Sequence, residues 1–205
     1  FSTPLYVSEH EVTQEDANYV RNLDYYEMKS NVGWMSEDSY VLDNSALQSL
    51  KDKVQKSVNE YVHDILEIQD DLDFFITNSW VTVHKEGDFA PTHDHVNSLL
   101  SGVLYINIPE NDESVIEFYA PSYVNLFPLI RPAIKAFNLW NSKSWFVEPK
   151  TGTIVLFPST QAHGTTPMTS STDERYCLAF NVFARGELSD TWQDNKASIN
   201  HLNLK

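Results

Sequence analysis

Three histidines have a spacing that could place their imidazoles around one metal ion. His93 and His95 form the pair in PTHDHVNS, and His163 follows the apolar stretch TGTIVLFP about 70 residues later. In extended backbone, residues i and i+2 point to the same side, so His93 and His95 can face one point while Asp94 faces away. A third ligand from a distant strand would leave one face of the ion open, as in non-haem iron(II) facial triads. An HxH pair by itself is also common among surface histidines.

Arg175 could supply an anion site near these histidines. It lies twelve residues after His163 and begins the stretch RYCLAFNVF. A strand that begins there could run antiparallel to the strand that ends near His163, with the guanidinium deep inside. Because a guanidinium pairs bidentately with a carboxylate, a dicarboxylic co-substrate could chelate the metal and pair with Arg175. The alternative is a structural ion pair with Asp173 or Glu174.

Further polar and aromatic residues could support the site. Asn97, Ser98 and Ser101 directly follow the histidine pair and could orient a ligand or the imidazoles, or could serve only the turn and the strand start. Tryptophans that could line a substrate pocket are Trp80, Trp140 and Trp145, although most tryptophans pack in cores. Surface roles are expected for the histidines in other segments, which are His10, His63 and His201.

The elements that must position these residues are predicted to be helices followed by short strands. Thr13 and Asp16 resemble a capping box that opens a short helix, and a longer helix begins at Asn44 or Ser45. Its apolar positions recur in steps of three and four: Leu47, Leu50, Val54, Val58, Tyr61, Ile65 and Ile68. Strands are predicted at 75–83, 99–108, 115–119, 145–147, 153–157 and 176–184. This order favours an α+β, mostly β domain in which helices pack on one sheet of a sandwich or barrel.

We expect one domain over 1–205, with a helical part over about 1–70, a β core over about 74–186 and a polar tail over 187–205. Residues 120–144 interrupt the strand pattern with three prolines and several large apolar side chains. A segment of this kind is often a lid or binding loop. The alternative is a packed connector without a role in chemistry.

Composition narrows the kinds of partner and compartment. Cys177 is the only cysteine, which excludes a disulfide within the chain and a cysteine-based zinc site, so histidines and carboxylates must hold any metal. It also favours a reducing, intracellular (cytoplasmic) location. The formal net charge of −15 argues against binding to nucleic acids or anionic membranes. No apolar stretch approaches 18 residues, so no membrane-spanning helix is expected.

Four segments together resemble a known family: FSTPLYV, NSWVTVHKEGDFAPTHDHVNSLLSGVLYINIP, GTIVLFPSTQAHGTTP and RYCLAFNVF. The most specific part is H-x-H-x-N-S-x-x-S-G-x-x-Y. The chain resembles 2-oxoglutarate- and iron(II)-dependent oxygenases, in particular a bacterial and phage subgroup distantly related to prolyl 4-hydroxylases. The resemblance implies a double-stranded β-helix (jelly-roll, cupin-like) core. It also implies iron(II) at His93, the residue two places on and His163, with the distal carboxylate of 2-oxoglutarate on Arg175.

The same resemblance adds Tyr105, which matches a tyrosine that prolyl hydroxylases often place near the co-substrate; the alternative is a core aromatic. We assign Asn97 to the co-substrate as well. Position 95 departs from the family, which usually has Asp or Glu there. Three neutral imidazoles leave the full 2+ charge on the metal, which a co-substrate dianion could neutralise. Asp94 could be an alternative ligand, or could tune the site from outside the ligand set, as Ser101 could.

Cys177 is a second departure, because relatives often have serine there and a thiol is a weak hydrogen-bond donor. The sequence therefore predicts a dioxygenase, a hydroxylase of an unidentified substrate, that uses iron(II), 2-oxoglutarate and molecular oxygen. The substrate would be a peptidyl side chain such as proline, or a small molecule. The alternatives are a three-histidine cupin dioxygenase without 2-oxoglutarate and a non-catalytic jelly-roll binding module.

Overall fold

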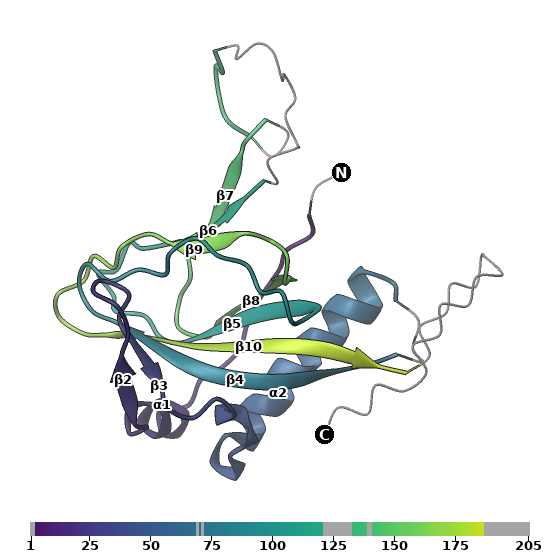
Figure 1. Cartoon of the computed structure of the whole chain (residues 1–205), viewed down its shortest axis with the longest axis horizontal. Helices are drawn as coiled ribbons and strands as arrows, with labels where there is room; N and C mark the ends of the chain where they lie inside the picture. Colours follow the sequence, from purple (N-terminus) through teal and green to yellow (C-terminus); the bar gives the residue numbers. More distant parts are fainter. Residues whose placement is uncertain (1–2, 69, 71, 121–132, 139–140, 187–205) are drawn as a thin grey trace.

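Two antiparallel sheets form the core of the computed structural model, which describes residues 3–68, 70, 72–120, 133–138 and 141–186 (Figure 1). The large sheet has seven strands in the order β1 (Tyr6–Glu9), β8 (Thr153–Pro158), β5 (Leu100–Asn107), β10 (Arg175–Arg185), β4 (Asp73–His84), β3 (Trp34–Ser36) and β2 (Tyr25–Glu27). The small sheet has the order β7 (Ser144–Val147), β6 (Ile116–Tyr119) and β9 (His163–Thr165). Helix α2 (Gln48–Asn59) crosses one face of the large sheet, and the small sheet lies on the other side.

The two faces of the large sheet have different partners because successive side chains of a strand point to opposite sides. On β10, Leu178 and Phe180 belong to the main hydrophobic core together with Leu50 and Val54 of α2. Cys177, which directly precedes Leu178, belongs instead to a second cluster between the two sheets: Tyr105, Ile116, Phe118, Val155, Phe157 and Cys177. The inner face of β10 therefore presents every second residue to the space between the sheets.

The N-terminal helices match their sequence signals closely. Helix α1 (Gln14–Arg21) opens with a reciprocal capping box, in which Thr13 accepts from the Asp16 backbone and Asp16 accepts from the Thr13 backbone. Three short helical turns flank α2: η1 (Val41–Asp43), η2 (Ser45–Leu47) and the π-helical η3 (Glu60–Ile65). The predicted long stripe ends early, because Ile65 is largely exposed and Ile68 lies beyond the helix.

Two predictions about the strands need correction. The region expected to be helical also contains β1, β2 and β3, which extend the large sheet at both of its edges. Arg175 does begin a strand, but β10 pairs with β4 and β5. It does not pair with β8, which ends near His163, since β8 pairs with β1 and β5. The guanidinium nevertheless enters the interior, because register places Arg175 on the inner face of the sheet.

The described part of the chain has no helix long and apolar enough to cross a membrane. The predicted lid over 120–144 and the polar tail over 187–205 fall largely or entirely outside the described residues, as do Trp140 and His201. His10 and His63 are partly buried rather than purely surface residues. The His10 ring lies 2.6 Å from the Ser57 hydroxyl, and His63 Nδ1 lies 3.1 Å from the Ile68 carbonyl oxygen.

Candidate metal centre

His93 and His163 are joined by the backbone itself. The two residues form an isolated antiparallel bridge, with N–H to O distances of 2.9 and 3.0 Å in the two directions. Gly164 permits this close approach, because a Cβ there would lie 2.9 Å from the Ala90 carbonyl oxygen and 3.2 Å from the Thr92 nitrogen. The small sheet thus fixes His163 against the loop that carries the other two histidines.

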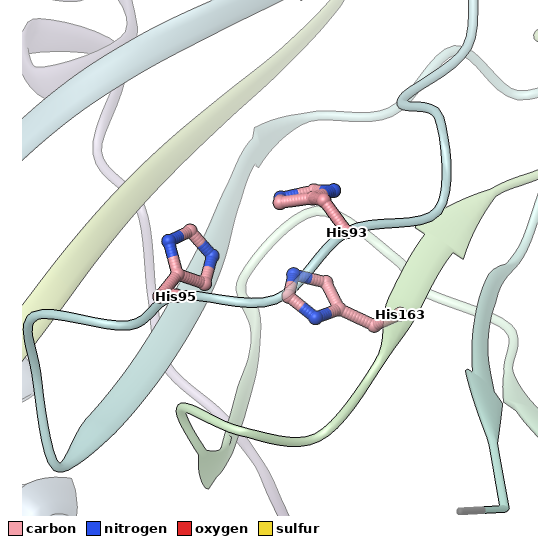
Figure 2. Close-up of side chains that lie close together, drawn as sticks. All are labelled: His93, His95 and His163. Carbon is pink, nitrogen blue, oxygen red and sulfur yellow. The ribbon is translucent and has the colours of Figure 1, made fainter. Parts of the chain in front are cut away.

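The three imidazoles converge on one point, as Figure 2 shows. Their candidate ligand nitrogens all lie within 4.8 Å of one another. Ring centroids are 5.0 Å apart for His93 and His95, 4.4 Å for His93 and His163, and 5.2 Å for His95 and His163. The structure brings together the three residues that the sequence selected. In the described part of the chain, this histidine cluster does not include the exposed Asp94.

Hydrogen bonds leave the outer nitrogens of two rings free. His93 Nδ1 lies 2.7 Å from the Pro91 carbonyl oxygen, and His163 Nδ1 lies 2.8 Å from that of Gln161. A carbonyl can only accept, so each Nδ1 carries the proton and each Nε2 keeps its lone pair. This is the arrangement by which proteins fix the tautomer of a metal-binding histidine.

The rings of His95 and His163 are neutral at pH 7. Burial lowers the pKa of His163 to about 4, and burial followed by the nearby His93 lowers the pKa of His95. Phe157 packs against His163 with a centroid distance of 4.4 Å, and Trp80 lies 6.1 Å from His95. Neutral imidazoles with free lone pairs, on an apolar background, fit a divalent transition metal such as iron(II).

A cluster of four polar side chains fixes the loop that follows His95. The Ser159 hydroxyl lies 2.6 Å from that of Ser98 and 2.8 Å from that of Ser101, and Ser101 donates to Asn181 over 2.9 Å. The backbone joins the same cluster to the metal centre, because the His95 N–H donates to the Ser159 carbonyl over 2.9 Å. Ser98 and Ser101 therefore position the loop, while Asn97 is exposed in its turn and stays only a predicted co-substrate ligand.

Arg175 is fully buried and connects the two sheets. Its Nη2 lies 2.7 Å from His84 Nδ1 and donates more weakly to Thr165 over 3.4 Å. Its Nη1 donates to the Ser114 hydroxyl and lies 3.5 Å from Asp112 Oδ2. Thr165 is two residues beyond His163 on β9, which places Arg175 roughly 7 Å along that strand from the metal centre.

Arg175 forms neither of the ion pairs that the sequence suggested, with Asp173 or with Glu174. Asp173 pairs with Arg21 and Glu174 with Lys85, so neither is the partner of Arg175. The Arg175 Nε has no hydrogen-bond partner among the described residues. A buried donor without a partner is costly, so this atom fits the carboxylate of a co-substrate.

Tyr105 and Cys177 lie opposite each other on β5 and β10 and face the same interior. Both are buried, and burial raises the pKa of Tyr105 and raises that of Cys177 to about 11. The phenol and the thiol are therefore protonated at pH 7. They can donate hydrogen bonds into the interior between the two sheets without adding negative charge.

His84, Asp112, Ser114 and Thr165 were missed by sequence reasoning. The first sits directly opposite Arg175 in the β4–β10 register, and strand pairing could have revealed it. Asp112 and Ser114 lie in the segment before β6, and nothing in their spacing points to Arg175. Asp112 and Ser114 reach Arg175 only because of the way the small sheet packs over the large sheet.

His84 makes the stability of the protein depend on pH. Burial, followed by the charge of Arg175, lowers its pKa to about 3, from 6.5 in the unfolded chain. Below pH 6.5 the unfolded chain therefore binds a proton that the folded chain excludes, so the free energy of unfolding falls as the pH falls. The slope from this one residue approaches about 1.4 kcal/mol per pH unit.

We expect His84→Asn, which keeps an acceptor for Arg175, to remove this slope. Urea unfolding at several pH values between about 6 and about 4 should show a shallower decline for the variant than for the wild type. Parallel declines for the two proteins would contradict the assignment.

Solved structures with similar folds include two prolyl hydroxylases and a protein with 2-oxoglutarate bound. A Pseudomonas putida prolyl-4-hydroxylase aligns with a TM-score of 0.59 and 16% identity over 90% of this chain and 95% of that one. HygX from Streptomyces hygroscopicus, with nickel, 2-oxoglutarate and hygromycin B bound, aligns with a TM-score of 0.60 and 12% identity over 88% of this chain and 83% of that one. A Trichoplax adhaerens prolyl hydroxylase in complex with a hypoxia inducible factor peptide aligns with a TM-score of 0.59 and 14% identity over 87% of this chain and 83% of that one. This likeness confirms the double-stranded β-helix fold.

The sequence also matches a family model described as "Putative 2OG-Fe(II) oxygenase" over residues 78–181. No curated protein sequence matches significantly. The matched range contains the three histidines, Tyr105 and Arg175, and it covers just over half of the chain. The family uses iron(II) and 2-oxoglutarate, for which the histidine cluster and the buried guanidinium provide suitable groups. The chain therefore belongs to the 2OG-Fe(II) oxygenase family.

Proposed function

We propose that this chain is an active dioxygenase in which His93, His95 and His163 hold iron(II) and Arg175 holds 2-oxoglutarate. The observation that carries the proposal is the convergence of three imidazoles beside a buried guanidinium whose Nε has no hydrogen-bond partner among the described residues. When bound, the metal and its co-substrate supply oxygen activation, which forms succinate and carbon dioxide and oxidises a substrate. The protein contributes position and a largely dry interior.

The residues divide this work between them. The carbonyls of Pro91 and Gln161 orient two of the imidazoles, and the polar cluster of Ser98, Ser101, Ser159 and Asn181 holds the loop of the third. Arg175 would bind the distal carboxylate, and Tyr105 could donate a hydrogen bond to the same molecule. His163 is buried whereas His93 is exposed, so the centre opens toward solvent on the side of His93. We propose that the substrate approaches from that side.

The substrate is proposed to be a peptidyl side chain or a small molecule that is hydroxylated. Both kinds appear among the similar folds, since one structure holds a peptide fragment and another holds hygromycin B. The exposed aromatic residues of β7, Trp145 and Phe146, are candidates for contact with it.

Anaerobic titration tests the proposal directly. The protein should bind one equivalent of iron(II), and added 2-oxoglutarate should then produce a weak visible charge-transfer band. Admitting oxygen should release succinate, slowly without a substrate, and His163→Ala should release none. Full iron binding without any 2-oxoglutarate binding would favour a three-histidine cupin dioxygenase. Failure to bind any divalent metal would favour a non-catalytic binding module.

A further inference from the structure

The buried guanidinium of Arg175 already has an anion from its own chain. Both the Arg175 and the Asp112 side chains are 1% exposed, and Nη1 lies 3.5 Å from Oδ2. The Ser114 hydroxyl bridges them, because it accepts from Nη1 and donates to Oδ2 over 2.7 Å. The charge that would attract the distal carboxylate of 2-oxoglutarate is therefore partly neutralised before any co-substrate arrives.

The carboxylate of Asp112 is held firmly in this place. Its Oδ1 accepts the backbone N–H of Ser114 over 3.1 Å and that of Thr169 over 3.0 Å, and it accepts the Thr169 hydroxyl over 3.2 Å. Burial by itself raises the pKa of Asp112, but these hydrogen bonds and Arg175 outweigh burial and leave the pKa below its ordinary value. Asp112 is thus a fixed negative charge that a co-substrate cannot easily displace.

An incoming carboxylate must then share Arg175 with Asp112. Nη1 is engaged by Ser114 and Asp112, and Nη2 by His84, which leaves Nε as the donor without a partner among the described residues. Two carboxylates on one guanidinium repel each other, and the repulsion is strong because water is excluded. A neutral, apolar end of a co-substrate would meet no such repulsion.

We propose that Asp112 is a specificity-determining residue that weakens the preference of the pocket for a dicarboxylic 2-oxo acid. This inference rests on the proposed function, since it takes Arg175 as the co-substrate anchor. It assigns to Asp112 the role of an internal anion that competes electrostatically with the distal carboxylate. The pocket should therefore discriminate only modestly between 2-oxoglutarate and 2-oxovalerate, which has the same five-carbon chain without the distal carboxylate.

The test compares these two acids in two proteins. Asp112→Asn keeps the Oδ1 acceptor for the backbone N–H groups of Ser114 and Thr169 but removes the charge. Anaerobic calorimetry on the iron(II)-loaded full chain should show 2-oxoglutarate binding about tenfold more tightly to the variant than to the wild type. Binding of 2-oxovalerate should change by less than about twofold, because that acid has no charge at its distal end.

Glu113→Gln is the matched control, because it removes one negative charge from the same segment at an exposed side chain. It should leave both affinities unchanged. The binding of 2-oxovalerate to Asp112→Asn reports whether the variant pocket is intact. Should that variant not fold, the wild-type protein still tests the inference. A preference for 2-oxoglutarate over 2-oxovalerate of about tenfold or less supports it, and a clearly larger preference overturns it.

The other outcomes separate the inference from the proposed function. If both proteins bind 2-oxoglutarate equally, or if Asp112→Asn binds it more weakly, Asp112 does not compete and only the inference fails. If neither protein binds 2-oxoglutarate although iron(II) fills the histidine cluster, the proposed function fails and the inference falls with it.

Discussion

Replacing His163 with alanine should abolish stoichiometric iron(II) binding while the protein stays folded. His163 is the buried member of the cluster, and its Nε2 is left free by the bond from Nδ1 to Gln161. Loss of a group that merely orients a ligand commonly weakens metal affinity about 10–100-fold, so loss of the ligand itself should cost more than about 100-fold. Anaerobic metal titration, followed by metal analysis after desalting, measures the effect.

Two further variants make this result specific. His63→Ala removes a partly buried histidine whose ring contacts Ile68 and Phe74, so metal binding should be unchanged. Asp94→Asn should also retain the metal, whereas His95→Ala should lose it. Retention of iron(II) by His95→Ala together with its loss in Asp94→Asn would make Asp94 the second ligand. Unchanged metal content in His163→Ala would remove the proposed centre altogether.

The fold was predictable where the local pattern is strong. The capping box of Thr13 and Asp16 begins a helix at the expected residue, and the long β-forming stretches became β4, β5, β8 and β10. Four short strands were missed, namely β1, β2, β3 and β9, which have three or four residues each and depend on their neighbours in the sheet. The order of the strands in the sheets could not be predicted from local sequence pattern either. For this reason the pairing expected for the strand of Arg175 was wrong.

The candidate site shows the same division. Extended backbone places the side chains of residues i and i+2 on the same side, so the convergence of His93 and His95 could be predicted from their spacing. The surroundings of Arg175 could not, because Asp112 approaches it across 63 residues of sequence, from the segment that precedes β6 of the other sheet. A sequence pattern can identify a residue that needs an anion, but only the packing of the two sheets identifies which anion is present.

Replacing Arg175 should remove most of the affinity for 2-oxoglutarate and should leave the metal centre intact. Arg175→Lys keeps a positive charge near Asp112 but loses the planar fork and the Nε donor. A charge-assisted hydrogen bond contributes about 1.5–3 kcal/mol, but Asp112 offsets part of this contribution, so the dissociation constant of 2-oxoglutarate should rise by about tenfold. Arg185→Lys is the matched control, since Arg185 lies at the other end of β10 in an exposed ion pair with Asp73.

A larger change at the same position needs a compensating substitution. Arg175→Met alone would leave Asp112 buried without its cation, which typically destabilises a protein by about 3–5 kcal/mol. Combining it with Asp112→Asn removes both charges, so the fold and iron(II) binding should persist. The double variant should bind 2-oxoglutarate no better than 2-oxovalerate, because neither charged residue remains to distinguish the two distal ends. If calorimetry instead shows that the double variant keeps the wild-type affinity for 2-oxoglutarate, the co-substrate is anchored by a different residue and Arg175 serves only to join the two sheets.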